Sequence, residues 1–323
     1  EFPGIEAQMK PEPEIIRANY KGSEKLINKV AVITGGDSGI GRSVAVHFGK
    51  EGADVAIIYL NEDEDAQMTK SLIEKEGKSC FLIKGDISDE SFCIDSVNQI
   101  IKQFGKINIL VNNAGMHEPK DDLGEISSAQ LEKVFKVNIF SFFYLSKESL
   151  KHMNPGDCII NTTSVTAFRG SEHLLDYSST KGAILSFTKS LSKNLCSKNI
   201  RVNAVAPGPI WTPLIPSTFD DVEEFGKQVP MERPGQPSEV GPAYVFLLAE
   251  CLAEAGEAAG RNPRRGPERK PSLDGDGLRL GRRDNRPDEQ VKCRRVRNAA
   301  QRSHHAGCSR WLFVRQRISV LVY

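Results

Sequence analysis

The sequence predicts an α/β fold, a single Rossmann-type domain built on a doubly wound parallel sheet. Short apolar runs rich in β-branched residues alternate with helical stretches from residue 29 to residue 205. Glycine-rich or polar turns follow these runs, and 323 residues suffice for one large domain with a real core. Strands that alternate with helices of this length form parallel sheets covered by helices on both faces.

The first strand and the turn after it predict a diphosphate site. Residues 29–34 form a short β-branched run typical of a buried strand, and a helical stretch follows the turn through Lys50. Glycines let the backbone approach phosphate, and a helix start offers free N–H groups and the positive end of a dipole. The alternative is a tight connection without a ligand. The candidate residues are Gly35, Asp37, Ser38, Gly39, Ile40 and Gly41.

The alternation continues along the chain. Further strands are predicted at residues 53–59, 79–84, 107–111, 157–163 and 200–205, and further helices at 63–76, 89–104, 127–152 and 176–196. Ligands of such sheets bind outside the carboxyl ends of the strands. We therefore expect the turns after these strands to converge on one edge of the sheet.

Tyr177 and Lys181 are the candidate proton-transfer pair. Four residues apart on a helix, they share one face. A nearby ammonium favours the phenolate and lowers the tyrosine pKa from its usual value of about 10. Such a pair can exchange a proton with a carbonyl or an alcohol. Taken alone, the spacing far more often marks only a solvated lysine beside a half-buried tyrosine.

Residues 26–248 resemble the short-chain dehydrogenase/reductase family. The matching motifs, in family order, are Thr34-Gly35-(x)3-Gly39-Ile40-Gly41, Asn112-Asn113-Ala114-Gly115, Asn138, Ser164, Tyr177-(x)3-Lys181 and Pro207-Gly208. The lead-in with Pro3-Gly4, Met9, Pro11 and Pro13 is similar to the bacterial glucose/ribitol dehydrogenase-like, or general-stress oxidoreductase, subfamily.

The resemblance implies an NAD(P)-dependent oxidoreductase that acts on CH–OH donors and transfers a hydride between a nicotinamide cofactor and a carbonyl or secondary alcohol. Tyr177 would be the general acid and base. Lys181 would bind the nicotinamide ribose and, with the positive oxidised ring, lower the pKa of the tyrosine. Ser164 would hydrogen-bond the substrate oxygen. Asn138 would hold a water that carries the proton onward.

The segment after the second strand favours NAD as cofactor and leaves NADP possible. Residues 59–65 are largely acidic, and Ser38 rather than a basic residue precedes Gly39. Negative charge near the ribose disfavours a 2′-phosphate. The alternative is that this acidic run is only the first turn of the next helix. By resemblance, further cofactor contacts are Tyr59, Asn61, Asp86, Ile87, Asn113, Ala114, Gly115, Pro207, Gly208, Ile210 and Thr212, together with Tyr177 and Lys181.

Substrate identity is weakly encoded. Loop 209–237 is predicted to cover the substrate with apolar side chains such as Trp211, although the same residues suit a dimer surface. His173 and Leu174 are candidate pocket residues, or simply surface residues. A sugar, a polyol, an aldehyde and a β-keto ester all stay open.

The cysteine content and the lack of a long apolar run predict a cytoplasmic location. Its seven cysteines show no C-x2-C spacing, which is typical of reduced thiols. No uncharged apolar run approaches the length of a membrane span. His304, His305 and Cys308 are too few for a metal site, and we predict none.

The chain is predicted to have three parts: an extended arm at 1–28, the Rossmann domain at 29–248 and an Arg/Gly/Pro-rich tail at 249–323. The tail has 15 Arg and 2 Lys and lacks the family's last motif. We expect it to be poorly ordered and the last sheet strand to be missing. That loss would put in doubt the homo-oligomer, a tetramer in the family, which the resemblance implies.

Two alternative functions follow from the tail. The chain could be a dinucleotide-binding pseudoenzyme disabled by its altered C-terminus. The basic tail could also bind nucleic acid. This second alternative is less favoured, because the tail shows no recognition helix, repeat or interleaved aromatic pattern.

Overall fold

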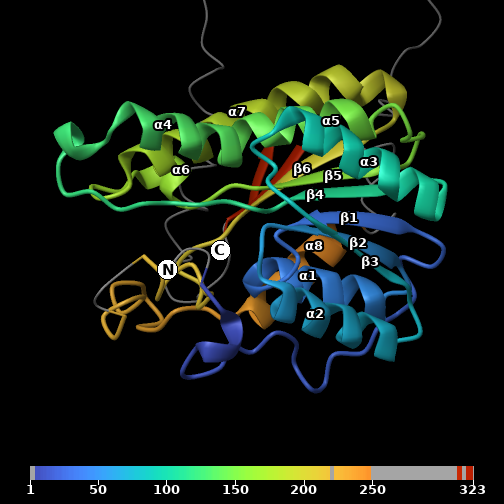
Figure 1. Cartoon of the computed structure of the whole chain (residues 1–323), viewed down its shortest axis with the longest axis horizontal. Helices are drawn as coiled ribbons and strands as arrows, with labels where there is room; N and C mark the ends of the chain where they lie inside the picture. Colours follow the sequence, from blue (N-terminus) through green and yellow to red (C-terminus); the bar gives the residue numbers. More distant parts are fainter. Residues whose placement is uncertain (1–3, 219–221, 249–310, 315–317, 323) are drawn as a thin grey trace, which may run out of the picture. The chain divides into compact units, whose positions relative to one another are not determined.

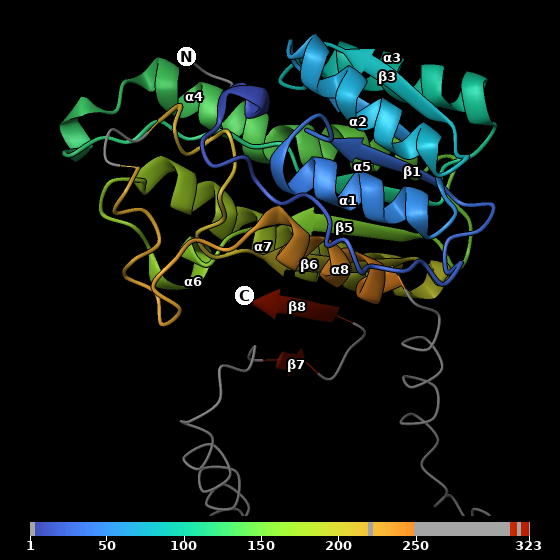
Figure 2. The same ribbon diagram turned by 90° about the horizontal axis from the view of Figure 1, so that it is seen from below.

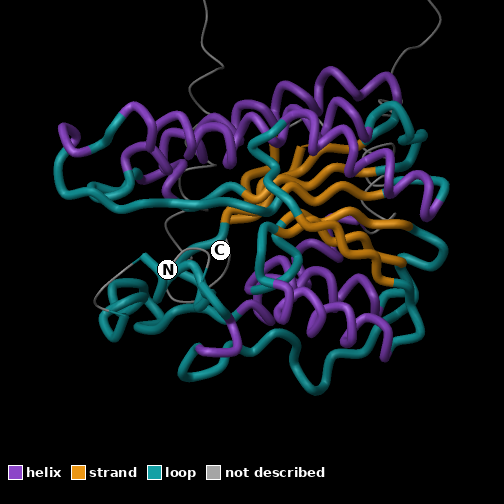
Figure 3. Tube along the Cα trace, in the orientation of Figure 1, coloured by secondary structure: helices purple, strands orange, loops and turns teal. Residues whose placement is uncertain are grey.

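The computed structural model describes residues 4–218, 222–248, 311–314 and 318–322. A largely parallel sheet forms the middle layer (Figure 1, Figure 3). Its strands are β1 (Val30–Thr34), β2 (Asp54–Tyr59), β3 (Cys80–Lys84), β4 (Ile109–Asn112), β5 (Cys158–Thr162), β6 (Arg201–Ala206), β7 (Trp311–Val314) and β8 (Ile318–Val322). The order across the sheet is β3-β2-β1-β4-β5-β6-β8-β7. The strand order therefore reverses between β1 and β4, which is where doubly wound sheets bind ligands.

Helices cover both faces of the sheet, so the predicted fold class is confirmed (Figure 1). One face carries α1 (Gly39–Lys50), α2 (Asp63–Lys75) and α8 (Pro237–Leu248). The other carries α3 (Glu90–Phe104), α4 (Ser128–Phe135), α5 (Ser141–Ser149), α6 (Thr166–Arg169) and α7 (Leu175–Leu195).

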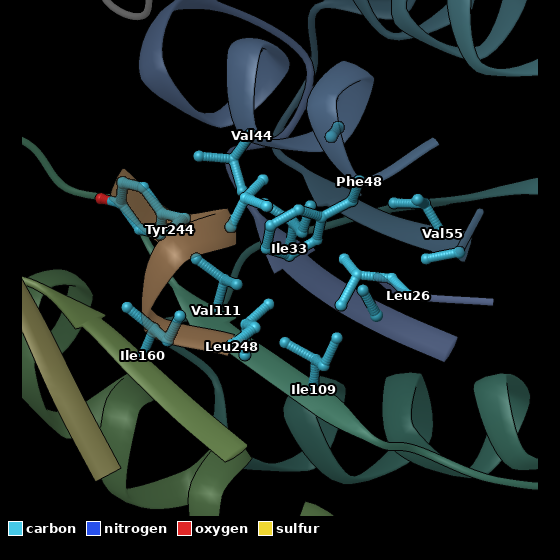
Figure 4. Packing of buried hydrophobic residues seen from close by; sticks show 14 of the residues in the cluster. Leu26, Ile33, Val44, Phe48, Val55, Ile109, Val111, Ile160, Tyr244 and Leu248 are labelled. Carbon is cyan, nitrogen blue, oxygen red and sulfur yellow. The ribbon is translucent and has the colours of Figure 1, made fainter. Parts of the chain in front are cut away.

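The core forms two main clusters because side chains alternate between the faces of a strand. In β1, Ile33 packs with Phe48 and Tyr244 in the cluster under α1 and α8 (Figure 4). Its neighbour Val32 packs with Leu145 in the cluster on the opposite face. Full burial of a side chain of this size contributes about 1.5–3 kcal/mol to stability. The sheet is thus a rigid base for the turns at its carboxyl edge.

The helical region predicted at 127–152 changes its helix type in the middle. A π-helical turn, η3 (Lys136–Phe140), separates α4 from α5. The wider turn holds Asn138 in the interior. Such bulges are frequent at functional sites. The helical region is therefore confirmed, and its π-helical middle turn is a detail that the sequence did not predict.

The prediction that the last sheet strand is missing is also wrong. Strand β8 lies parallel to β6, with Ala204 paired to Val320 and Ala206 to Val322 (Figure 2). The outer edge of β6 has unpaired backbone groups, and a short β-branched segment satisfies them. The tail's composition did not show that its final residues suit this edge. Residues 249–310 lie outside the described part, and the division at residues 28 and 248 stays a prediction.

The N-terminal arm, residues 4–28, runs along the outside of α1 (Figure 1). Apart from the short η1 (Glu6–Gln8) it has no helix or strand, as predicted for an extended lead-in. It is nevertheless packed against the domain. Met9 is buried with Trp211 and Ile215, and Trp211 donates a hydrogen bond from Nε1 to the Pro11 carbonyl at 2.8 Å. The arm thereby joins the first residues to the loop after β6.

None of the helices in the described ranges combines the length and the apolar character needed to cross a membrane.

Candidate active site

A cavity of about 1100 Å³ opens at the carboxyl edge of the sheet. It is lined by the glycine-rich turn after β1 and by the segments that follow β2, β3, β4, β5 and β6. This is the edge on which the turns were expected to converge. The predicted residues that line it are Gly35, Asp37, Ser38, Gly39, Ile40, Tyr59, Asp86, Ile87, Asn113, Ala114, Gly115, Ser164, Tyr177, Lys181, Pro207, Gly208, Ile210 and Thr212.

The glycine-rich turn needs its glycines for two different reasons. Gly35 and Gly39 have φ angles of +61° and +53°, which side-chain-bearing residues rarely adopt. At Gly41 a Cβ atom would lie 1.8 Å from the Gly35 carbonyl oxygen. Gly41 is buried and does not line the cavity, so it serves the packing of helix on turn. Asn61 is exposed outside the cavity.

Tyr177 and Lys181 stand one helical turn apart near the start of α7, facing the cavity. The Lys181 ammonium lies 5.2 Å from the centre of the Tyr177 ring and donates a hydrogen bond to the Thr162 carbonyl at 3.0 Å. Ser164, two residues beyond the end of β5, is hydrogen-bonded to the Tyr177 side chain. The structure therefore brings together three of the four residues predicted to be catalytic.

The pKa values of this pair differ from the sequence-based expectation. Burial raises the pKa of Tyr177 to about 12, and the hydrogen bond with Ser164 opposes this only in part. Burial also lowers the pKa of Lys181 to about 7. Both shifts arise because a low-dielectric interior disfavours the charged form of each group. Within the protein alone, Lys181 does not lower the pKa of Tyr177.

Asn138 lies behind the cavity and does not line it. Its Oδ1 accepts a hydrogen bond from the Met116 N–H at 2.8 Å, and its Nδ2 donates to the Met116 carbonyl at 2.8 Å. Nδ2 also donates to the Thr180 hydroxyl at 3.1 Å. Asn138 thus ties the segment after β4 to α7. Its predicted role of holding a water stays a prediction.

His117 is a pocket residue that the sequence analysis missed. Its ring packs edge-on against Tyr177, with centroids 5.3 Å apart, and its Nε2 lies 2.6 Å from the Thr218 hydroxyl. Burial lowers the pKa of His117 to about 4, so the ring is neutral at pH 7. His117 follows β4 at the edge where ligands bind, a signal that could have identified it.

The other predicted pocket residues divide into rim and interior. His173 is about half exposed at the rim, with Nδ1 3.1 Å from the Asp121 carboxylate, whereas Leu174 is buried. Ile215 lines the cavity, but Trp211 packs on the arm instead. Loop 209–237 is therefore partly a cavity wall and partly an anchor for the arm.

Two further missed residues, Glu6 and Arg42, lie under the glycine-rich turn. The Gly39 N–H, expected to be free for a ligand, donates to the Glu6 carboxylate. The same carboxylate pairs with the Arg42 guanidinium. Burial raises the pKa of Glu6 to about 7 and that of Asp37 to about 6. Glu6 is 33 residues from Gly39 in the chain, and no local sequence pattern predicts the contact.

Part of the acidic segment 59–65 forms the start of α2, which was the alternative to a role in cofactor selection. Asp63 begins α2 and accepts a hydrogen bond from the Tyr59 hydroxyl at 2.9 Å. Its carboxylate also pairs with Lys84 at 2.6 Å. Leu60 and Glu62 line the cavity.

Within the described residues, no group of three His, Cys, Asp or Glu side chains could hold a metal ion. His304, His305 and Cys308 lie outside the described residues.

The sequence of residues 35–254 matches a family model described as enoyl-(acyl carrier protein) reductase. The chain is 56% identical over 250 residues to the uncharacterized oxidoreductase YhdF of Bacillus subtilis, covering 77% of this chain and 86% of that protein. It is 49% identical over 257 residues to the glucose and ribitol dehydrogenase of Daucus carota, covering 77% and 88%.

A solved structure with the same arrangement is a short-chain dehydrogenase from Burkholderia cenocepacia in complex with NADP. Its TM-score is 0.66 at 28% identity, covering 70% of this chain and 92% of that one. The resemblance identified from the motifs is therefore confirmed by independent comparisons of sequence and of structure.

Proposed function

Because the chain belongs to the short-chain dehydrogenase/reductase family of nicotinamide-dependent oxidoreductases, we propose that it oxidises a secondary alcohol of a sugar or polyol and reduces the matching carbonyl. Tyr177 is the general acid and base of this reaction. The observation that carries the proposal is the joint position of Tyr177, Ser164 and Lys181 at the cavity.

The cavity fits a dinucleotide. Gly35 and Gly39 line it with φ angles in the left-handed region, and without side chains their backbone can approach a diphosphate closely. Asp86 and Ile87 would border the adenine. Ile210 and Thr212 would lie at the nicotinamide end. When bound, the cofactor supplies the hydride acceptor or donor.

The protein's part is to position the substrate and to move one proton. Ser164 would hold the substrate oxygen, and Tyr177 would take the hydroxyl proton as the hydride leaves the neighbouring carbon. A pKa of about 12 makes Tyr177 a poor base at pH 7. The positive ring of the oxidised cofactor and an ammonium form of Lys181 would both lower this pKa. In the reverse direction the neutral phenol donates the proton.

The choice of a sugar or polyol rests on the polar side chains among the residues that line the cavity. Side chains able to bond hydroxyl groups line it, among them Arg169, Ser171, His173 and Gln228. The relative from Daucus carota is named a glucose and ribitol dehydrogenase. NAD is the preferred cofactor in our proposal, because Asp37 and Glu62 bring negative charge to the ribose end.

The test is a substrate panel. The full chain is incubated with NAD and a series of sugars, polyols, simple alcohols and β-hydroxy esters, and the absorbance of the reduced nicotinamide is followed. We expect turnover of polyhydroxy substrates and a loss of about 10²–10⁴-fold in kcat for Tyr177→Phe. Tyr144→Phe, a tyrosine outside the cavity, is the matched control.

Cofactor binding without turnover of any substrate would instead favour the pseudoenzyme. The pseudoenzyme alternative was based on the altered C-terminus and a missing last strand. The structure has β8 beside β6, so the main argument for that alternative no longer holds. The nucleic-acid alternative concerns residues outside the described part and is not favoured.

We further propose a homo-oligomer. Leu131 on α4, Phe140 in η3 and Phe143 on α5 are large apolar side chains exposed by 40% or more. A second copy of this chain would cover them. Light scattering of the purified chain, compared with Phe143→Ser, tests this assembly.

We also propose a cytoplasmic location. Cys80, Cys93 and Cys158 are free and buried, as reduced thiols are in a reducing compartment. Fractionation of the native cell tests it.

A further inference from the structure

The N-terminal arm carries a carboxylate into the interior beneath the glycine-rich turn. Glu6 is only 2% exposed, and its backbone N–H donates to Asp65 Oδ2 at 2.9 Å. One carboxylate oxygen accepts a hydrogen bond from the Gly39 N–H, and the other pairs with Arg42. A residue of the arm thus caps the first helix and neutralises a buried arginine.

All three nitrogens of the Arg42 guanidinium are engaged within the protein. Nε donates to the Asp37 carbonyl at 2.8 Å and to the Thr69 hydroxyl at 2.9 Å. Nη2 donates to the carbonyl and the carboxylate of Asp65 at 3.0 and 2.9 Å. Nη1 is held by Glu6. At 6% exposure, Arg42 has no donor directed into the cavity.

The position of Arg42 in the fold relates these contacts to cofactor binding. Arg42 lies beneath the glycine-rich turn and against the first turns of α2, next to the end of β2 where Rossmann folds read the adenine-side ribose. An arginine in that region can accommodate the 2′-phosphate of NADP. The nearby cation Lys84 is paired with Asp63. Glu6 therefore pairs with the arginine that lies directly beneath the glycine-rich turn.

We propose that Glu6 determines cofactor preference: by holding Arg42 beneath the turn and adding negative charge below Asp37, it makes the site select NAD over NADP. This inference rests on the proposed function, since it assigns a role at the same cofactor site. Glu6 is a positioning residue, because it acts through Arg42 and through the charge around Asp37. The arm then belongs to the cofactor site.

Other contacts hold the arm, and with it Glu6, in place. The Glu14 N–H donates to Gln236 Oε1 at 2.9 Å, and the Ser238 N–H donates to the Glu14 carbonyl at 2.8 Å. A Cβ atom at Gly4 would come within 2.3 Å of the Pro213 carbonyl oxygen. These contacts lie away from Arg42. Glu14 is accordingly a control within the same arm.

The experiment measures the dissociation constants of NADH and NADPH for the full chain at pH 8.5, above the raised pKa of about 7 of Glu6, by fluorescence of the reduced nicotinamide, in the wild type and in Glu6→Gln. Glutamine keeps the acceptor for the Gly39 N–H but removes the charge. We expect the ratio of the NADPH constant to the NADH constant to fall by about tenfold. Glu14→Gln, which alters an exposed arm carboxylate, should leave this ratio unchanged.

An unchanged ratio in Glu6→Gln, with both cofactors still bound, overturns the role of Glu6 and leaves the proposed function intact. A wild-type chain that binds neither cofactor overturns both. Should Glu6→Gln fail to fold, Asp65→Asn removes the other carboxylate on Arg42 and carries the same test. The ratio should then fall in the same direction, and an unchanged ratio again contradicts the inference.

Discussion

The two walls of the cavity differ in whether their buried cation has a carboxylate partner. The catalytic wall consists of Ser164, Tyr177 and Lys181. The loop wall consists of the turn 35–41 together with Glu6 and Arg42, which lie beneath the turn and do not line the cavity. In the catalytic wall the Lys181 ammonium donates to a neutral carbonyl, and burial lowers its pKa to about 7. In the loop wall the Arg42 guanidinium meets two carboxylates, those of Glu6 and Asp65.

This difference distinguishes side chains that take part in function from side chains that stabilise the fold. Uncompensated ionisable groups in a cavity are typical of functional sites, because a bound ligand can supply the missing charge or hydrogen bond. Compensated charges hold segments together and cost stability when one partner is lost. We therefore expect substitutions in the loop wall to act on folding and on cofactor preference, and those in the catalytic wall mainly on turnover. Three experiments probe this expectation.

The largest effect is expected for Arg42→Met. It leaves Glu6 and Asp65 buried without a countercharge, and it should lower the free energy of unfolding by about 3–5 kcal/mol. Arg17→Met is the matched control, because Arg17 forms an exposed pair with Glu239 at 3.4 Å and should lose about 0–1 kcal/mol. Urea denaturation measures both. Equal losses for the two variants would contradict the stabilising role of the buried charge pairs of Arg42.

A smaller, pH-dependent effect is expected for Lys181→Met. Because the folded-state pKa of Lys181 is lowered from 10.5 to about 7, charging it costs folding free energy. The cost is present in full below about pH 7 and disappears as the pH rises toward 10.5. Between pH 7 and 10 the wild type should therefore gain about 2–4 kcal/mol relative to Lys181→Met.

Denaturation at several pH values measures this difference, and a gap that stays constant with pH would contradict the burial of an uncompensated lysine. Turnover should be lost in Lys181→Met at every pH, which distinguishes the catalytic wall from the loop wall.

The smallest effect is expected for Thr218→Val. It removes the hydroxyl that contacts His117 Nε2 and should cost about 1 kcal/mol of stability. Because His117 packs on Tyr177, KM for the substrate should rise while the dissociation constant of NADH stays unchanged. Ser217→Ala is the control: its hydroxyl bonds the Leu214 carbonyl and not His117. Identical KM values in the two variants would remove His117 from the substrate side of the cavity.

Local patterns predicted most of the catalytic wall. The tyrosine–lysine spacing, the serine after β5 and the polar turns at strand ends were all identified, and their positions at the cavity agree with the prediction. They were predictable because each belongs to a motif whose residues are close in sequence and whose strand ends share one edge. The π-helical turn around Asn138 was missed, since its residues also fit a regular helix.

The loop wall and the outer edge of the sheet could not be predicted in the same way. Glu6 and Arg42 are 36 residues apart, and the arm looked like a lead-in without a structural role. Strand β8 comes from the end of a segment whose overall composition suggested no strand at all. In both cases the contact depends on which unpaired groups the folded domain exposes to a distant segment.

The sequence by itself determined the doubly wound fold and the family, and it predicted which side chains react, because periodicity and short motifs encode local structure. Only the tertiary structure decided the charge states of those side chains, the partners of Arg42 and the strand beside β6. The physical reason is that pKa values, charge compensation and edge pairing depend on burial and on neighbours brought together by folding. Burial and contacts between distant residues cannot be read from the residues that are adjacent in the sequence.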